Sequence, residues 1–353
     1  MNFKKLTVSA AALLMAGSLL TACGNGIVKP AVSFNNGKTQ IASHINTAPD
    51  TVRRAAALAA LPDGVVPVTW EPSSEHLIID SEEARTLYKR IKADDYPTVE
   101  ELKSNPVTAQ IDALSTYYKK IYGNTADINT PERKQLRKAI EKQFLSVGSA
   151  RTESVDPETG RHKYVYDGDF AKEFKMELVL GLPASGKSTR VTDPDSEEMK
   201  AFILDCDVVK EMIPEFQESH GAAADAVHFE SFNIMDSAMQ QFLTGDMKGT
   251  NVIIPIVASD FDELMKNYIQ PFEQAGYHVT AKFVECEENA SVSRNIAREL
   301  ETGRIINSAV VLSFGEKPLQ VYKQLAPMQN AFGETYGKTV LSSEVQKEVK
   351  PAA

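Results

Sequence analysis

An apolar segment runs directly into a glycine-rich loop in the second half of the chain. Residues 176–180 are followed by Gly181-Leu182-Pro183-Ala184-Ser185-Gly186-Lys187-Ser188, which fits the pattern G-x-x-x-x-G-K-[ST] at every position. Glycines let successive backbone N–H groups turn toward an anion, and a helix that begins in the loop adds its positive end. The sequence therefore predicts a strand, an anion-binding loop and a helix, in that order.

The same residues indicate which anion the loop would hold. The pattern is that of the P-loop, whose backbone surrounds the phosphates of a nucleoside triphosphate, and we expect the nucleotide site to extend over residues 181–189, through Thr189. Lys187 would reach the β- and γ-phosphates, and the Ser188 hydroxyl would bind Mg²⁺. The predicted cofactor is therefore Mg²⁺, with ATP or GTP as the bound nucleotide.

Strand-like and helical patterns alternate around this loop. Short apolar segments at 201–204, 251–257, 279–284 and 339–341 are separated by helical patterns at 222–243, 261–274, 290–302 and 318–335. Such alternation implies a parallel sheet that is covered by helices on both faces. We predict a three-layer α/β domain of the P-loop NTPase and kinase class over residues 173–345.

The first 22 residues have the features of a signal peptide. Lys4 and Lys5 precede an apolar run at 6–20, and the small-residue stretch Leu20-Thr21-Ala22 leads to Cys23. This stretch resembles the lipobox of bacterial lipoproteins, in which Cys23 would carry the lipid. An uncleaved anchor helix and an ordinary signal with a chance cysteine are the alternatives. We expect an exported protein that is held at the cell membrane or cell envelope through Cys23.

Two further segments separate this signal from the P-loop domain. Residues 23–75 are rich in Gly, Asn, Pro, Ala and Ser, which predicts a lipid anchor with a flexible tether and one short helix at 53–61. Residues 76–172 form a mainly helical N-terminal extension, with helix starts at Ser81 and Thr98. No residue cluster in this extension suggests chemistry, and we expect it to pack as a cap on the next domain.

Charge and cysteine content exclude two classes of protein. The formal net charge is −10, whereas a general nucleic-acid-binding protein needs a basic surface, so we expect no nucleic-acid partner. Only Cys206 and Cys286 follow Cys23, which is too few for a disulfide framework. We expect both to be buried thiols.

One predicted strand ends in two carboxylates, in the sequence Leu204-Asp205-Cys206-Asp207. Ligand-binding and catalytic groups of parallel sheets gather at the carboxyl ends of the strands. Asp207 could take a proton from an acceptor hydroxyl or orient it, and the alternative is an N-cap of the next helix. Asp205 could order the water ligands of Mg²⁺ or cap that helix instead.

Two helical segments carry further candidates. His228 and Ser231 lie one turn apart with Glu230 close by, so they could line a pocket for the acceptor or form a solvated helix edge. Arg298 and Arg304 could close over a triphosphate as part of a lid, because charge spreads over the phosphoryl oxygens during transfer. An ion pair with Glu301 is the alternative for Arg298.

Taken together, these segments resemble the zeta toxin family of P-loop kinases over residues 176–310, about the second half of the chain. The resemblance rests on the P-loop, residues 181–189, and on segments that follow it in the sequence. These segments are Leu204-Asp205-Cys206-Asp207-Val208-Val209-Lys210, Pro214-Glu215-Phe216, Ala226-Val227-His228-Phe229-Glu230-Ser231, Asn251-Val252-Ile253-Ile254-Pro255, Arg298 and Gly303-Arg304. The P-loop is shared by many families, and the other segments are more selective.

The resemblance implies an activity and roles for individual residues. The activity is phosphoryl transfer from ATP or GTP to a hydroxyl of a small molecule, a UDP-N-acetyl amino sugar. Asp207 corresponds to the catalytic base and Lys187 to the P-loop lysine, while Arg298 and Arg304 correspond to two arginines that contact phosphate. The strand at 251–257 lacks the Gly-Thr pair that some members carry, and the chain contains no recognisable antitoxin segment.

Two other functions stay open on sequence grounds. One is a P-loop NTPase or nucleotidyl transferase with another acceptor, and the other is a surface lipoprotein that binds nucleotide without turnover. The intact set of Lys187, Ser188 and Asp207 favours an enzyme. The export signal conflicts with a cytosolic supply of nucleotide, and the sequence does not resolve this conflict.

Overall fold

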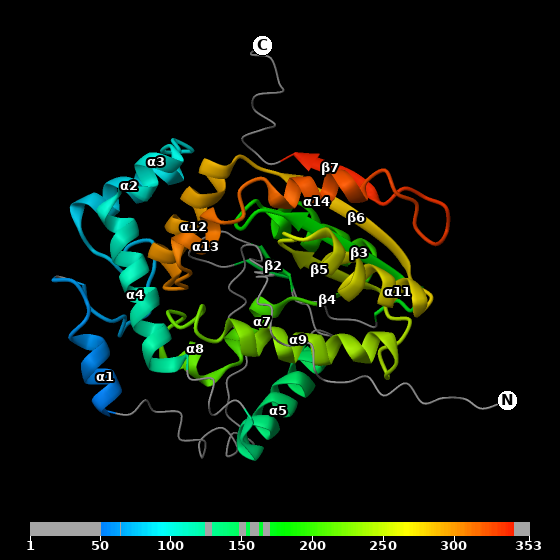
Figure 1. Cartoon of the computed structure of the whole chain (residues 1–353), viewed down its shortest axis with the longest axis horizontal. Coiled ribbons are helices and arrows are strands. Elements are labelled where there is room, and N and C mark those ends of the chain that lie inside the picture. Colours follow the sequence, from blue (N-terminus) through cyan, green and yellow to red (C-terminus); the bar gives the residue numbers. More distant parts are fainter. Residues whose placement is uncertain are drawn as a thin grey trace, which may run out of the picture.

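A computed structural model shows the fold of residues 51–63, 65–123, 129–147, 153–155, 162–164 and 170–341 (Figure 1). Five parallel strands form the central sheet of this described part, in the order β4-β5-β3-β6-β7. β3 (Lys175–Gly181) lies in the middle between β5 (Val252–Ile256) and β6 (His278–Glu285), with β4 (Phe202–Ile203) and β7 (Gly337–Leu341) at the edges. The parallel α/β fold predicted from the sequence is confirmed.

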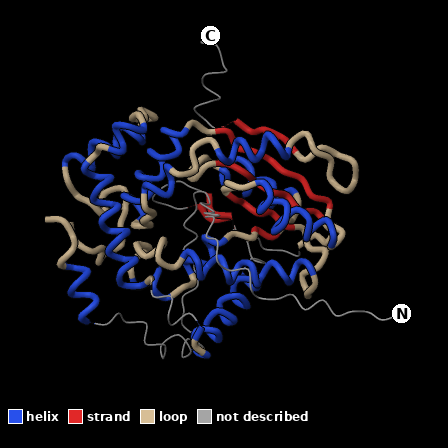
Figure 2. The backbone as a smooth tube through the Cα atoms, in the orientation of Figure 1, coloured by secondary structure: helices blue, strands red, loops and turns tan. Residues whose placement is uncertain are grey.

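The middle strands are apolar because helices cover both of their faces. In β3 every residue after Lys175 is buried, and so is all of β5. One face packs against α9 (His228–Leu243), the nearly continuous helical segment from Phe261 to Gln274, and α14 (Lys317–Leu325). Figure 2 shows these helices around the red strands. The other face packs against Val191 of η3 (Ser188–Thr192), which follows the P-loop, and α6 (Asp193–Glu198) is joined to β6 by the ion pair between Asp195 and Lys282.

The N-terminal extension is helical as predicted. Its helices are α1 (Thr51–Leu58), α2 (Glu82–Lys92), α3 (Val99–Lys103), α4 (Pro106–Tyr122) and α5 (Pro131–Val147). The hydroxyls of Ser81 and Thr98 accept backbone hydrogen bonds at the starts of α2 and α3, and Thr98 forms a full capping box with Glu101. Both helix starts predicted from the sequence are therefore present.

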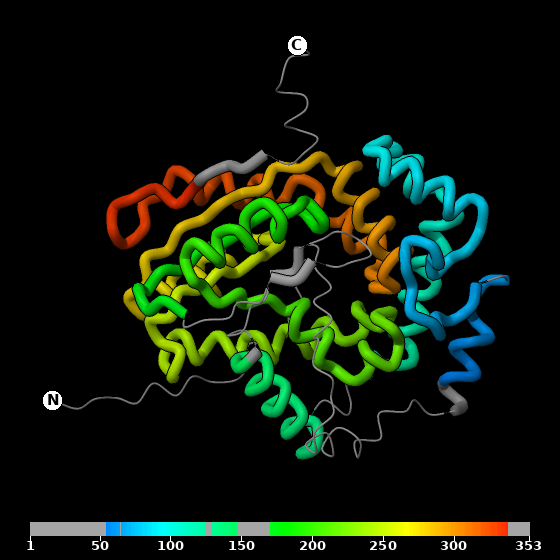
Figure 3. Tube along the Cα trace, turned by 180° about the vertical axis from the view of Figure 1, so that it is seen from behind, coloured from blue at the N-terminus to red at the C-terminus, as the bar shows by residue number. Residues whose placement is uncertain are grey.

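The extension and the P-loop domain share a second hydrophobic core. Leu114 and Ile121 of α4 join Ile296 and Leu300 of α12 (Glu288–Thr302) and Val311 of α13 (Ser308–Leu312) in one buried cluster. Figures 1 and 3 show these helices side by side on the flank of the sheet domain. The expected packing of a cap on its domain is present. The contact includes α12, which contains Arg298 and ends just before Arg304.

The predicted tether ends earlier in the chain than expected. Ala57, Val65 and Val68 are buried in the second core, and the backbone N–H of Val68 donates to the Tyr118 hydroxyl at 2.8 Å. The prediction of a flexible tether up to residue 75 is wrong for these positions, because scattered apolar residues there fill gaps beside α4. Cys23 and the signal segment lie outside the described residues.

The last helix of the extension belongs to the first core. Leu136, Ile140 and Phe144 of α5 pack with the sheet domain, and the Phe144 ring meets the Phe202 ring edge to face. A short antiparallel pair follows, β1 (Glu153–Val155) and β2 (His162–Tyr164), and the residues that join the two strands lie outside the described part of the chain. The extension therefore contacts both cores.

Two predicted helix ends need correction. α9 begins at His228 instead of residue 222, since the Ser219 hydroxyl and the turns after Gly221 hold residues 222–227. α14 ends at Leu325 instead of residue 335, because Pro327 disfavours a helical conformation at the residue before it. Two short helices, α7 (Cys206–Glu211) and α8 (Pro214–Glu218), were not predicted as separate elements.

The two cysteines in the described part of the chain are not joined in a disulfide. Cys206 is buried as expected, whereas Cys286 is partly exposed. Within the same residues, each helix is too short or too polar to cross a bilayer.

Candidate active site

The P-loop leaves the central strand in a conformation that its glycines permit. A side chain at Gly181, whose φ is +152°, would lie 2.9 Å from the backbone oxygen of Val284 on the neighbouring strand. Gly186 has a φ of +90°. Ala184, which lies between these two glycines, also has a positive φ, of 50°. The loop is thus a tight turn at the carboxyl end of β3, where the sequence places it.

Lys187 lies inside this turn. Its side chain is fully buried, and its ammonium donates to the backbone oxygens of Gly181 at 3.0 Å and Leu182 at 2.6 Å. Ser188 begins the helix η3 and is largely buried. The Ser185 hydroxyl is buried and has no hydrogen-bond partner among the described residues. The loop therefore holds a cation and an unsatisfied donor at its centre, as an anion site requires.

The next strand in the chain, β4, lies beyond β5 in the sheet and brings two carboxylates to the same carboxyl end of the strands. Asp205 is the N-cap of α7, because its side chain accepts the backbone N–H of Asp207 at 2.8 Å. Asp207 lies inside the helix and is not its cap. The capping role that the sequence left open for both residues therefore belongs to Asp205, and the carboxylate of Asp207 is left to side-chain partners.

Two of those partners are cations. The ammonium of Lys210 lies 2.9 Å from Oδ1 of Asp207, and the guanidinium of Arg304 forms an ion pair with the same oxygen. All three side chains are buried. Burial alone raises the pKa of a carboxyl group, but Arg304 and Lys210 outweigh it and hold the pKa of Asp207 well below its usual range. Asp207 is an anion in this arrangement.

Arg304 reaches Asp207 from the far end of α12. Gly303 ends that helix in the left-handed conformation, with a φ of 71°, and a side chain there would lie 2.7 Å from the backbone oxygen of His220. The tight turn at Gly303 sends the Arg304 side chain toward α7. The Nε of Arg304 has no hydrogen-bond partner among the described residues. Arg304 therefore has a donor that is not used by Asp207.

Arg298 lies on α12 before that turn. It is buried, and its Nη2 donates to Oδ1 of Asn295 at 2.7 Å. The alternative partner expected from the sequence, Glu301, instead pairs with Lys92 of α2 at 2.7 Å. The charge of Arg298 also contributes to the low pKa of Asp207. Both candidate arginines therefore act on the Asp207 carboxylate.

A family comparison agrees with this geometry. Residues 168–326 match the model of the zeta toxin family. The match confirms, over these residues, the resemblance that the sequence motifs indicated. The match covers the P-loop, Asp207 and both arginines, and it leaves the helices α1 to α5 outside. A comparison with curated proteins gives no match.

Several solved structures resemble the chain at low sequence identity. A chain of the PezAT chromosomal toxin–antitoxin system of Streptococcus pneumoniae is 14% identical, with 59% of this chain and 78% of that chain covered and a TM-score of 0.40. A candidate kinase from Chloroflexus aurantiacus J-10-fl is 16% identical, with 49% and 91% covered and a TM-score of 0.34. A gluconokinase from Sinorhizobium meliloti 1021 is 16% identical, with 51% and 89% covered and a TM-score of 0.28.

Two of the three candidate acceptor residues, Glu230 and Ser231, form hydrogen bonds within the chain. Glu230 is buried and accepts hydrogen bonds from Arg133 of α5, and Arg137 of that helix pairs with it at 3.2 Å. The hydroxyl of Ser231 donates to the backbone oxygen of His228 at 2.7 Å. Glu230 therefore forms an internal ion pair, whereas the sequence left a contact with the acceptor and a solvated helix edge as its alternatives.

Arg133 was missed by the sequence reasoning. It lies on α5 beside the apolar stripe, and its guanidinium also donates to both oxygens of Glu215, at 2.7 and 3.0 Å. An arginine next to the buried face of an amphipathic helix is a signal of a buried ion pair. Nothing in the sequence indicates that its two acidic partners are 82 and 97 residues further along the chain.

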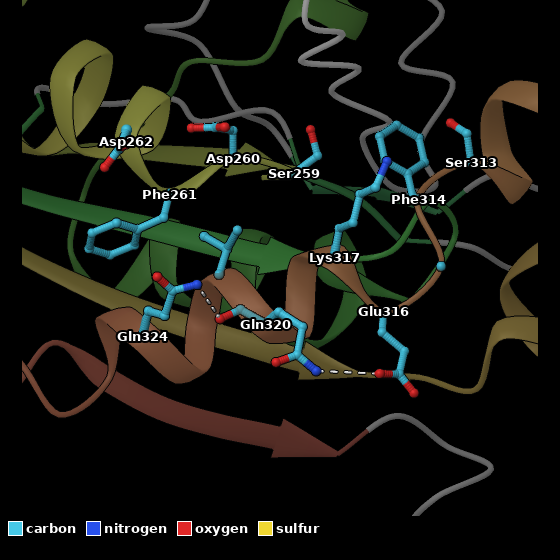
Figure 4. A pocket seen from close by; sticks show the side chains of 12 residues that line it. Ser259, Asp260, Phe261, Asp262, Ser313, Phe314, Glu316, Lys317, Gln320 and Gln324 are labelled. Carbon is cyan, nitrogen blue, oxygen red and sulfur yellow. Dashed lines mark hydrogen bonds between the residues drawn. The ribbon is translucent and has the colours of Figure 1, made fainter.

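A hollow of about 580 Å³ lies near the P-loop at the same edge of the sheet. Figure 4 shows its lining, which includes Ser259 and Asp260 after β5 and Lys317 and Gln320 of α14. Leu182 of the P-loop packs with Phe314 on its wall. Its polar groups can form hydrogen bonds with a ligand, and the carboxyl edge of the sheet is where parallel folds bind ligands.

Proposed function

We propose that the P-loop domain is a Mg²⁺-dependent kinase that transfers a phosphoryl group from ATP or GTP to a hydroxyl of a small molecule. One observation carries this proposal: the Asp207–Arg304 ion pair lies at the same sheet edge as the P-loop. A base for a hydroxyl, a cation for the transferred group and a loop for the triphosphate are the parts that phosphoryl transfer needs.

The residues present fit a nucleotide and its metal ion. The unsatisfied Ser185 hydroxyl and Arg304 Nε are donors without acceptors in the described chain, which phosphate oxygens would supply. The Lys187 ammonium can exchange the backbone oxygens of Gly181 and Leu182 for oxygens of the β- and γ-phosphates. Ser188 would hold Mg²⁺ with Asp205 near its water ligands, and the ion would neutralise charge on the phosphates.

Four residues of the site would have separate roles in phosphoryl transfer. Lys187 holds the triphosphate in place, and Arg298 and Arg304 face charge that spreads over the transferred group. Once Arg304 turns toward phosphate, Asp207 loses one of the cations that lower its pKa and becomes a better proton acceptor. Asp207 orients the acceptor hydroxyl and takes its proton as the new bond to phosphorus forms, while the bond between the γ-phosphorus and the bridging oxygen breaks and the nucleoside diphosphate leaves.

The resemblance to zeta toxins suggests the acceptor class, a UDP-N-acetyl amino sugar. The test is incubation of the protein with labelled ATP or GTP, Mg²⁺ and a panel of nucleotide-sugars, free sugars and other alcohols. We expect label on a nucleotide-sugar and no transfer by Lys187→Ala. Release of free phosphate that no acceptor stimulates would indicate an NTPase, transfer of a nucleotidyl group would indicate a nucleotidyl transferase, and binding without turnover would exclude an enzyme.

A further inference from the structure

Two cations hold one oxygen of Asp207, and they come from different elements. Lys210 lies one helical turn after Asp207 on α7, whereas Arg304 follows α12 in the chain. Lys210 is among the most buried cations of the site, with 3% of its surface exposed. A lysine is costly to bury, and its position on Oδ1 of Asp207 is what compensates this cost.

The two cations differ in what can draw them away. Arg304 lies in the turn after Gly303, has an unsatisfied Nε, and is the residue that phosphate oxygens would attract. Lys210 belongs to the same six-residue helix as Asp207, and that helix is fixed at its start by the Asp205 cap. Any movement of Asp207 with α7 therefore carries Lys210 along, while Arg304 can leave.

We propose that Lys210 is a positioning residue for Asp207. When Arg304 moves to the γ-phosphate of bound ATP, Lys210 remains on Oδ1 and keeps the carboxylate where it meets the acceptor hydroxyl. Without Lys210, the departure of Arg304 would remove the second of these two cations from a buried carboxylate, so the exchange itself would be opposed. This inference rests on the proposed function.

The first experiment measures nucleotide affinity and needs no acceptor. ATP and ADP are titrated into the full chain, its Lys210→Met and Lys210→Arg variants, and the double variant Lys210→Met with Asp207→Asn. We expect Lys210→Met to weaken ATP affinity about tenfold, since Arg304 must then leave a buried anion that has already lost the cation of Lys210. ADP lacks the γ-phosphate, so its affinity should change little. Lys210→Arg should bind ATP like the wild type.

The double variant separates positioning from a merely structural contribution. Removal of the Asp207 charge releases Arg304, so ATP affinity should return at least to the wild-type value. If Lys210→Met binds ATP as well as the wild type does, or if the second substitution restores nothing, the proposal is wrong. Lys210→Gln is the substitute should the methionine variant not fold, with circular dichroism and the thermal midpoint as the check on folding.

The second experiment uses the acceptor identified in the transfer assay. Lys210→Met should lower kcat by about tenfold or more while the KM of the acceptor stays nearly constant, and Lys210→Arg should restore most of the loss. Equal losses in the methionine and arginine variants would overturn the positioning role. If no acceptor is phosphorylated by the wild type, the proposed function fails, whereas the ATP and ADP titrations still decide the exchange of Arg304.

Discussion

Asp207 is the residue at which binding and chemistry can be separated. Its carboxylate holds Arg304 in the structure, and an amide would keep the size of the side chain without its charge. We expect Asp207→Asn to bind ATP as tightly as the wild type or somewhat more tightly, because Arg304 is released toward phosphate. Turnover should fall by roughly a hundredfold or more, since an amide cannot take the proton of the acceptor.

Lys187→Ala is the matched comparison, because Lys187 would contact phosphate both before and during transfer. Its loss should weaken nucleotide binding and turnover together. The measurements are nucleotide titrations and product formation at saturating acceptor. A near wild-type rate for Asp207→Asn would mean that Asp207 serves only as an ion-pair partner of Arg304 and Lys210.

Glu177 is a second buried carboxyl group whose charge state links the fold to pH. It lies on β3 among apolar residues, with Lys282 of β6 at 3.1 Å and Asp195 of α6 bound to the same lysine. Burial, and after it the nearby Asp195, raise the pKa of Glu177 from 4.5 to about 8. The folded chain therefore keeps the proton of Glu177 at pH values at which the unfolded chain has lost it.

The sign of the resulting pH dependence follows from this difference. The unfolded chain releases the proton near its ordinary pKa of 4.5, and the folded chain does so near 8, so stability falls as pH rises between these values. Between pH 5 and 8, the free energy of unfolding of the wild type should fall by on the order of 2–4 kcal/mol through this proton. We expect Glu177→Gln to lack this decrease. Urea unfolding of both proteins at these two pH values is the measurement. Parallel stability curves would contradict the assignment.

At the residue scale, local patterns were predictable and distant partners were not. The P-loop follows from eight consecutive residues, and the Asp205 cap was one of two roles that its position before a helix allowed. The partner of Glu230 was not predicted, because Arg133 lies 97 residues away in the chain. Charges at helical spacing indicate that a partner is needed, but they do not say which element supplies it.

At the scale of elements, one arginine joins three helices. Arg133 of α5 binds Glu215 of α8 and Glu230 of α9, and all three side chains are buried. We expect Arg133→Met to destabilise the protein by about 3–5 kcal/mol, because two buried carboxylates lose their main cation. Lys134→Met, on the exposed side of α5, is the matched control and should change stability by less than about 0.5 kcal/mol.

Urea unfolding of the two variants measures the difference. If the cost comes from unpaired charge, addition of Glu215→Gln and Glu230→Gln to Arg133→Met should recover part of it. An Arg133→Met variant as stable as the control would show that Arg137 alone satisfies both carboxylates.

Helix ends show the same division between local and distant causes. The start of α3 was predictable because the Thr98–Glu101 capping box is four residues long. The end of α14 was placed ten residues too late, although Pro327 was present in the sequence as a stop signal. The start of α9 depends on turns that Ser219 and Gly221 hold beside Gly303, which no local pattern reveals.

At the scale of the whole molecule, the extension supports the helix that leads to the candidate site. Tyr96 accepts hydrogen bonds from Arg294 of α12 at 2.8 and 3.0 Å, and the backbone N–H of Ile78 donates to the backbone oxygen of Leu300. Asp112 of α4 accepts the backbone N–H of Ser308 at 2.7 Å. Periodicity predicted that these helices have a buried face, but it carried no information on the α12 surface that covers this face.

The segment before the extension provides the last test, because composition and structure disagree about it. Residues 24–75 have the composition of a tether, yet Val65 and Val68 are buried against α4. A protein that starts at residue 51 keeps these contacts, and we expect it to bind nucleotide with unchanged affinity. A protein that starts at residue 76 loses them, together with the hydrogen bond from Val68 to Tyr118.

Burial of a valine side chain contributes about 1.5–3 kcal/mol, so the shorter protein should be at least about 3 kcal/mol less stable. Its apparent nucleotide affinity should also fall, because a smaller fraction of the protein is folded. In addition, α4 should pack less firmly on α12, the helix that leads to the turn before Arg304. Thermal unfolding and ATP titration of the two proteins are the measurements, with the full chain as reference. Equal stability of the two would mean that residues 51–75 only cover the surface of the second core, and that the structural domain begins at residue 76 as the sequence had suggested.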